Sequence, residues 1–321
     1  MPTKQTFFIL EVLDIQKEIN EITGFKNLEL LAKQVVEGFI SGLHKSPFHG
    51  FSAEFAEHRI YNQGESTKHI DWKLFAKTDK LYTKRYEEET NLRCHMIIDN
   101  SSSMHYPDLK QFNINSLNKI GFSVLASSAI MNLLKRQRDT VGLSIYSNEY
   151  EFYSTEKGSE RHHHMLLGKL NKILEQSREN IGTKTYTYLH EIADKLKRRS
   201  MIFLFTDMFQ SDTDAEKLFE ALQHLKYNKH EVILFLVYDK GKEIEFNFSN
   251  RPKRFVDVET GEHVNLYAEN IKDNYKAAVE NYFTALKLRC GQYRIIYVPV
   301  DINEDFITIL TTFLVARQKF G

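Results

Sequence analysis

The segment CHMIIDNSSSM, residues 94–104, changes within a few positions from a mostly apolar run to a cluster of oxygen-bearing side chains. A short apolar run of this kind that ends in Asp99 is typical of a buried β-strand. Ligands of open α/β sheets bind at the carboxyl ends of the strands, where such a run stops. The segment therefore predicts a central strand, 94–99, whose end offers Asp99, Ser101 and Ser103 at one edge of a sheet.

Strands and helices alternate from residue 91 to the C-terminus. We expect strands at 94–99, 140–147, 150–154, 201–207, 231–239 and 293–300, of which the second and third form a hairpin. We expect helices at 114–137, 161–176, 185–198, 213–228, 268–289 and 304–319. This alternation predicts an α/β fold with a mostly parallel sheet and helices on both faces. A β-hairpin inserted at about residues 244–266 is expected to turn around Glu259-Thr260-Gly261.

The composition, 42% hydrophobic and 27% charged, is that of an ordinary globular protein. Lys and Arg number 43 and so do Asp and Glu, so the net charge is zero and gives no bulk attraction to nucleic acid or anionic membranes. The two cysteines are far apart, which suits a reducing compartment. Apolar runs are too short for a signal peptide or for the ~20 residues of a membrane helix. We therefore expect a cytoplasmic protein without nucleic-acid binding or membrane insertion.

Two further oxygen-bearing side chains adjoin the predicted sheet edge. Thr183 lies in the loop before the helix 185–198, and Asp207 ends the strand 201–207. Mg²⁺ prefers oxygen ligands in an octahedron. Carboxylates from Asp99 and Asp207 would balance its charge, whereas hydroxyl groups bind it without neutralising it further. Such an ion can accept one more carboxylate from outside, which favours recognition over hydrolysis.

The pattern Asp99-x-Ser101-x-Ser103, followed by Thr183 and Asp207, resembles the metal-ion-dependent adhesion site of von Willebrand factor A domains. The series of strands and helices around it is similar to that fold. The resemblance implies that Ser101, Ser103 and Thr183 contact the metal, and that Asp99 and Asp207 bind it directly or through water. The implied ion is Mg²⁺, or Mn²⁺ or Ca²⁺ in its place. The implied partner is a protein that donates an acidic side chain.

Residues 50–89, GFSAEFAEHRIYNQGESTKHIDWKLFAKTDKLYTKRYEEE, resemble the signature of domain-of-unknown-function family 58. These von Willebrand A-like proteins are commonly encoded beside MoxR-type AAA+ ATPases. The matching features are Glu54-Phe55, Arg59-x-Tyr61, Gly64, Ile70-Asp71-Trp72, Ala76 and Leu81-Tyr82-x-Lys84. The sequence departs from the family at Gly64-Glu65-Ser66, usually Gly-Asp-Asp, and at Lys68-His69, where an arginine is usual. The resemblance implies an adaptor whose metal site binds a partner, with a MoxR-type ATPase that remodels or loads the complex.

We expect two parts in the chain. Residues 1–90 hold N-terminal helices, near 8–20 and at 28–43, and the signature segment 50–89, and residues 91–321 form the von Willebrand A-like domain. The only tryptophan, Trp72, is expected to pack the N-terminal segment onto the sheet domain. Arg59 and Asp71 are expected to form a buried ion pair there. The alternative for this pair is two solvated charges.

Catalytic motifs are absent from the sequence, which contains no GxSxG elbow, Walker A loop or GxGxxG loop. The joint occurrence of the five metal-site positions and the 50–89 signature makes a non-enzymatic adaptor the leading hypothesis. One alternative is a metal-dependent phosphoesterase or nuclease that uses the same edge and a metal-bound water. Another is a structural module in which the residues after the strand only form a loop and cap the next helix.

Overall fold

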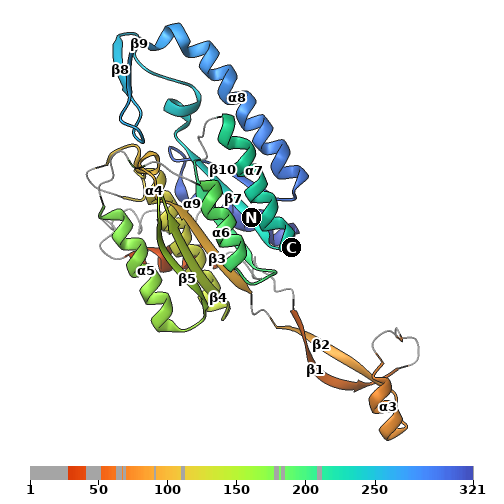
Figure 1. Ribbon diagram of the computed structural model, residues 1–321. Helices are drawn as coiled ribbons and strands as arrows, with labels where there is room; N and C mark the ends of the chain where they lie inside the picture. Colours follow the sequence, from red (N-terminus) through yellow and green to blue (C-terminus); the bar gives the residue numbers. More distant parts are fainter. Residues whose placement is uncertain are drawn as a thin grey trace, which may run out of the picture. The chain divides into compact units, whose positions relative to one another are not determined.

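The computed structural model describes residues 28–40, 52–62, 67, 70–89, 92–109, 113–176, 181, 185–207 and 212–320 (Figure 1). The chain divides into two compact units. One comprises Met1–Phe48 together with Arg93–Gly321, and the other is His49–Leu92. Helix α2 (Leu28–Ile40) therefore belongs to the unit that holds the large sheet, whereas the sequence placed it with the signature segment. The helix expected near 8–20 lies outside the described residues.

The larger unit is built on a sheet. Among the described residues this sheet has six strands, in the order β10-β7-β6-β3-β4-β5. These strands are β3 (Arg93–Asp99), β4 (Thr140–Tyr146), β5 (Tyr150–Lys157), β6 (Met201–Thr206), β7 (Glu231–Tyr238) and β10 (Ile296–Asp301). Every neighbouring pair in this order is parallel except β4 and β5, which form the predicted hairpin. The predicted α/β fold with a mostly parallel sheet is confirmed.

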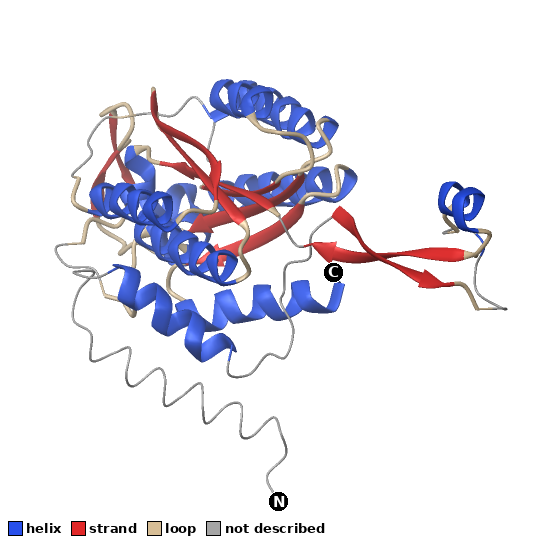
Figure 2. Ribbon diagram, turned by 90° about the horizontal axis from the view of Figure 1, so that it is seen from below, coloured by secondary structure: helices blue, strands red, loops and turns tan. Residues whose placement is uncertain are grey.

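Helices cover both faces of this sheet (Figures 1 and 2). They are α4 (Lys119–Arg136), α5 (Glu160–Leu174), α6 (Thr185–Lys195), α7 (Asp212–Tyr227), α8 (Ala268–Gln292) and α9 (Phe306–Phe320). Side chains of α6, α7 and α8 share one hydrophobic cluster with alternate residues of the central strands, such as Ile202 and Leu204. On β7, Phe235 stacks on Phe205 with ring centroids 4.6 Å apart and also meets Phe313 of α9. Successive side chains of a strand point to opposite faces of the sheet. Because both faces are covered by helices, nearly every residue of a central strand is apolar.

Helix α4 is the most deeply buried helix of the part that the structure describes, and residues 119–134 all lie in the interior. It begins at Lys119 because the Asn118 side chain accepts a hydrogen bond from the Gly121 amide, which caps the helix. Helix α2 packs against it. The first residue of α4 therefore lies inside the protein, near the carboxyl ends of the strands.

A second, smaller antiparallel pair lies between β7 and α8 in the sequence. After a short π-helical turn, η4 (Lys240–Ile244), strand β8 (Pro252–Val256) pairs with β9 (His263–Tyr267). The predicted hairpin is confirmed. Its turn contains Gly261, whose φ of 76° lies in the left-handed region that favours glycine.

The smaller unit is a hairpin of β1 (Ser52–Ile60) and β2 (Tyr82–Glu89) with helix α3 (Trp72–Thr78) between the strands. Asp71 caps α3, because its Oδ1 atom accepts hydrogen bonds from the Lys73 amide at 3.0 Å and the Leu74 amide at 3.1 Å.

The signature residues Trp72 and Arg59 lie in this unit. The Trp72 side chain is 60% exposed, and its ring meets Phe75 edge-on. Its packing on the sheet domain and the ion pair between Arg59 and Asp71 stay predictions. Among the described residues of either unit, no helix has the length and apolar character to cross a membrane.

Candidate functional site

Asp99 ends β3 and is fully buried, with 0% exposure, at the carboxyl edge of the sheet. Its Oδ1 atom accepts a hydrogen bond from the Ser101 amide at 3.1 Å, and its Oδ2 atom accepts one from the Thr206 hydroxyl at 2.9 Å. Burial and the nearby charge of Asp207 raise the pKa of Asp99 to about 7. A cation bound beside Asp99 would favour its ionised form and so lower this raised pKa.

The serine loop follows Asp99 and forms the short 3₁₀ helix η3 (Ser102–His105). The hydroxyl oxygens of Ser101 and Ser103 are 3.0 Å apart, so both can serve one small ligand. Ser102 exchanges two hydrogen bonds of 2.9 Å with the backbone of Ile181. These bonds attach the loop to the segment just before Thr183. Thr183 lies outside the described residues, so its contribution to the site stays a prediction.

Asp207 follows β6, the strand next to β3, and is 2% exposed. Its Oδ2 atom accepts a hydrogen bond of 2.8 Å from the Lys119 ammonium group, which also donates to Glu243 Oε1 at 2.6 Å. Burial disfavours the charge on Lys119, but Asp207 and Glu243 outweigh burial and raise its pKa. The buried lysine therefore offsets part of the carboxylate charge at this edge.

Sequence reasoning missed Lys119 and Glu243. A lysine in the first turn of a helix lies at the end where a positive charge is disfavoured, and such a residue usually points into solvent. The expected helix 114–137 hid this signal, because it put Lys119 beyond the first turn. Glu243 carried no comparable signal, because its partner is 124 positions away in the sequence.

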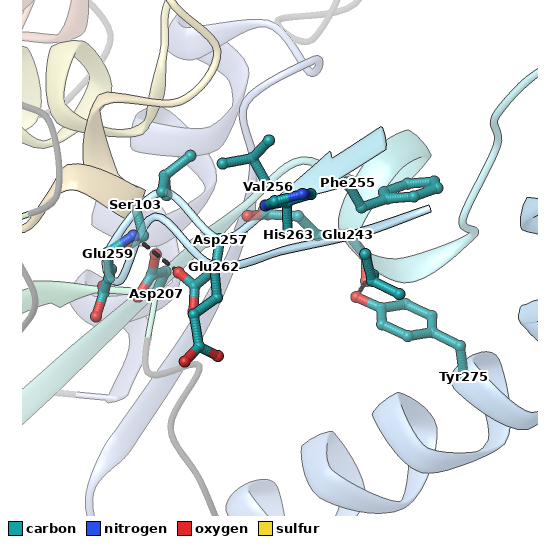
Figure 3. Close-up of a pocket in the computed structure, with 12 residues that line it drawn as sticks. Ser103, Asp207, Glu243, Phe255, Val256, Asp257, Glu259, Glu262, His263 and Tyr275 are labelled. Carbon is teal, nitrogen blue, oxygen red and sulfur yellow. Dashed lines mark hydrogen bonds between the residues drawn. The ribbon is translucent and has the colours of Figure 1, made fainter. Parts of the chain in front are cut away.

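A cavity of about 730 Å³ opens beside these residues (Figure 3). Ser103, Asp207 and Glu243 line it from the sheet edge, and the β8–β9 hairpin lines it from the other side. Figure 3 shows Glu259 of the hairpin turn at the end near Ser103 and Asp207, and Tyr275 at the opposite end. The candidate site is therefore open to a ligand, and five of the twelve residues that line the cavity are acidic.

The donor atoms of this edge fit a hard divalent cation. The described donors are carboxylate and hydroxyl oxygens from Asp99, Ser101, Ser103 and Asp207, which suit Mg²⁺ or Mn²⁺ better than a metal that prefers nitrogen or sulfur. Within the described ranges, no group of three or more His, Cys, Asp or Glu side chains is arranged to hold a metal. The described donors at this edge therefore include the serine hydroxyl groups as well as carboxylates, and metal binding by them stays a prediction.

Comparisons with known proteins identify the family of the chain. The family model described as "Protein of unknown function DUF58" matches residues 57–283. The uncharacterized protein Mb1516 of Mycobacterium bovis is 21% identical over 184 residues, which are 57% of this chain and 56% of that protein. The chain thus spans about half the length of the curated relatives it matches.

Two solved structures are similar to the chain at low identity. The conserved hypothetical protein BatB from Bacteroides thetaiotaomicron has a TM-score of 0.41 and 12% identity, and the match covers 72% of this chain and 100% of BatB. The SpRpn10 VWA domain has a TM-score of 0.37 and 12% identity, over 69% of this chain and 94% of that domain.

Proposed function

The chain belongs to the DUF58 family of proteins of unknown function, and we propose that it is a non-catalytic adaptor that binds a divalent cation at the serine loop and, through it, a protein partner. The observation that carries this proposal is the convergence of the Asp99 carboxylate with the hydroxyl groups of Ser101 and Ser103 and with Asp207. The partner would donate an acidic side chain. Mg²⁺ is the proposed ion, and Mn²⁺ or Ca²⁺ can replace it.

The charges around the site support recognition of an anion. A bound Mg²⁺ would supply positive charge to the edge of the sheet. Lys119 already offsets charge on Asp207 and Glu243, and the serine hydroxyl groups carry none. One lysine balances only one of these two carboxylates, so Asp99 and one further negative charge remain to balance the ion. A divalent cation whose charge is only balanced, with hydroxyl oxygens among its ligands, can still take one further carboxylate oxygen.

A MoxR-type AAA+ ATPase is the proposed partner that remodels or loads the complex. The support for this part is the resemblance of residues 50–89 to the signature of a family commonly encoded beside such ATPases. The signature residues form a compact unit of their own, the β1–β2 hairpin with α3. Its exposed Trp72 and Ile60 offer apolar surface for a partner.

Metal binding is tested by calorimetric titration of Mg²⁺ into the wild type and Asp99→Asn. We expect one ion per chain in the wild type and no measurable binding in the variant. The matched control is Asp301→Asn, which removes a buried carboxylate at the end of β10, beyond β6 and β7 on the same edge. Equal Mg²⁺ affinity in wild type and Asp99→Asn would overturn the proposed site.

Partner binding is tested with the purified MoxR-type ATPase of the source organism and immobilised wild-type protein. We expect retention in Mg²⁺, and loss of retention with a chelator or with Asp99→Asn. Retention that neither the chelator nor Asp99→Asn reduces would contradict a metal-dependent adaptor.

A metal-dependent phosphoesterase or nuclease is the second candidate function. The observation that favours it is Glu259, a half-buried carboxylate beside the serine loop, where a hydrolytic site would need a general base. Turnover of a generic phosphodiester in Mg²⁺ that is lost in both Asp99→Asn and Glu259→Gln would replace the adaptor proposal by this one.

A further inference from the structure

The β8–β9 hairpin brings an acidic side chain of the protein itself to the candidate metal site. Glu259 belongs to the hairpin turn, yet it is half-buried and lies near Ser103 and Asp207 (Figure 3). Burial raises the pKa of Glu259, a hydrogen bond with the Ser103 hydroxyl lowers it, and the charge of Asp207 adds to the rise. A turn glutamate would ordinarily extend into solvent, whereas this one lines the cavity together with Ser103 and Asp207.

The turn is constructed in a way that fixes Glu259. The Asp257 carboxylate accepts hydrogen bonds from the Glu259 amide at 2.8 Å and the Thr260 amide at 3.3 Å. The Asp257 carbonyl oxygen accepts a further bond from the Gly261 amide at 2.8 Å. An Asx turn of this kind holds the backbone around Glu259 in one conformation. The turn thus fixes the point at which the Glu259 side chain leaves the backbone.

An aromatic cluster anchors the hairpin at its other end. Phe255 of β8 stacks on Phe246 with ring centroids 5.5 Å apart, and Phe246 also contacts Tyr275 of α8 at 4.5 Å. The Tyr275 hydroxyl donates to the carbonyl oxygen of Glu243 at 2.8 Å. Glu243 in turn binds Lys119. The anchor of the hairpin and the charged residues of the site are therefore one connected set of contacts.

We propose that Glu259 is a built-in occupant of the metal site, which holds at Ser103 the place that a partner's acidic side chain takes when it binds. This inference rests on the proposed function and adds its regulation. Partner binding then requires the turn 257–262 to move away from the serine loop. A carboxylate tethered on the same chain competes at a high effective concentration, so free carboxylates and weak partners are excluded.

The proposal is tested with Mn²⁺, whose bound waters are counted from the relaxation of water protons. We compare the wild type, Glu259→Gln and a control, Glu269→Gln, which changes an exposed glutamate in the first turn of α8. Glu259→Gln should bind Mn²⁺ about tenfold more weakly, as for loss of a group that supports a metal site. It should also show higher relaxivity per bound ion, since water replaces the carboxylate. The control should match the wild type in both quantities.

Acetate serves as the carboxylate probe in the same experiment. We expect acetate to lower the relaxivity of Glu259→Gln at concentrations that leave the wild type unchanged. Amide hydrogen exchange of residues 252–267 should slow on addition of Mn²⁺ in the wild type and not in Glu259→Gln. Equal Mn²⁺ affinity, relaxivity and acetate response in wild type and Glu259→Gln would overturn the internal occupant while leaving the metal site intact. No Mn²⁺ binding by the wild type would overturn both.

Discussion

The Lys119 ammonium group donates to the Asp207 carboxylate across 2.8 Å, and both side chains are almost entirely buried, at 1% and 3% exposure. The pair joins the first residue of α4 to the end of β6 at the edge of the sheet. Glu243, in the segment that precedes the β8–β9 hairpin, forms a second ion pair with Lys119. One lysine therefore links the sheet, a central helix and the hairpin region around the candidate site.

Loss of the Lys119 charge should destabilise the protein strongly. Lys119→Met leaves Asp207 and Glu243 buried without their cation, and removal of one partner of a buried pair typically costs about 3–5 kcal/mol. Urea unfolding of wild type and variant measures this difference. The matched control is Lys135→Met in the same helix, whose lysine pairs with the exposed Glu160 and should contribute less than about 1 kcal/mol. Equal stabilities of Lys119→Met and wild type would contradict the structural role of this pair.

Asp99→Asn should stabilise the metal-free protein at neutral pH. The pKa of Asp99 is about 7 in the folded state, above its usual value of 3.8, so the unfolded state ionises first. The contribution of Asp99 to stability is therefore present below about pH 4 and is lost as pH rises through 7. Asp99→Asn does not titrate and so does not lose this stability. Its free energy of unfolding should therefore exceed that of the wild type by an amount that grows between pH 4 and pH 8.

The measurement for Asp99 is the free energy of unfolding at several pH values in the presence of a chelator. Added Mg²⁺ should stabilise the wild type and leave Asp99→Asn unchanged, since only a protein that binds the ion gains stability from it. A variant that is less stable than the wild type throughout this pH range would contradict the account of a strained carboxylate.

Protonation of His230 should destabilise the fold in mild acid. Burial lowers the pKa of His230 to about 4, and the Ser200 amide donates to its Nδ1 atom at 3.1 Å, which requires that nitrogen to be unprotonated. The unfolded state binds a proton near pH 6.5, so the contribution of His230 to stability is lost as pH falls from about 6.5 to 4. His230→Asn keeps an acceptor and should show a flatter pH dependence of unfolding. An identical slope in both proteins would refute this assignment.

A single substitution tests the predicted role of Thr183 as a metal ligand. Thr183→Val removes the hydroxyl group and keeps the shape of the side chain. If the hydroxyl contacts the metal, Mg²⁺ affinity measured by calorimetry should fall about tenfold. Thr187→Val, an equivalent change within α6, should leave the affinity unchanged. An unaltered affinity in Thr183→Val would remove this residue from the site.

The sequence predicted the fold well because the signals for its elements are local. The run 94–98, the hairpin of β4 and β5, and the turn at Gly261 are each visible within a few residues as apolar patterns or turn residues. The placement of Asp99 and Asp207 at one edge followed from the rule that parallel strands end together.

The missed features depend on contacts between distant parts of the chain. Lys119 meets Asp207 across 88 positions, and no pattern around either residue indicates the partner. Glu259 was predicted as part of a turn, but its position over Ser103 depends on how the aromatic cluster around Phe246 holds the hairpin. The same applies to α2, whose amphipathic pattern predicts a helix and leaves open that it packs on α4.

The central claim is that a divalent cation binds between the Asp99 carboxylate and the serine hydroxyl groups. Anomalous diffraction from crystals soaked in Mn²⁺ tests it most directly. We expect a single strong peak within bonding distance of the hydroxyl oxygens of Ser101 and Ser103, with Lys119 still bound to Asp207. A peak at another place, or none at this edge, would contradict the claim and leave the serine loop with a structural role alone.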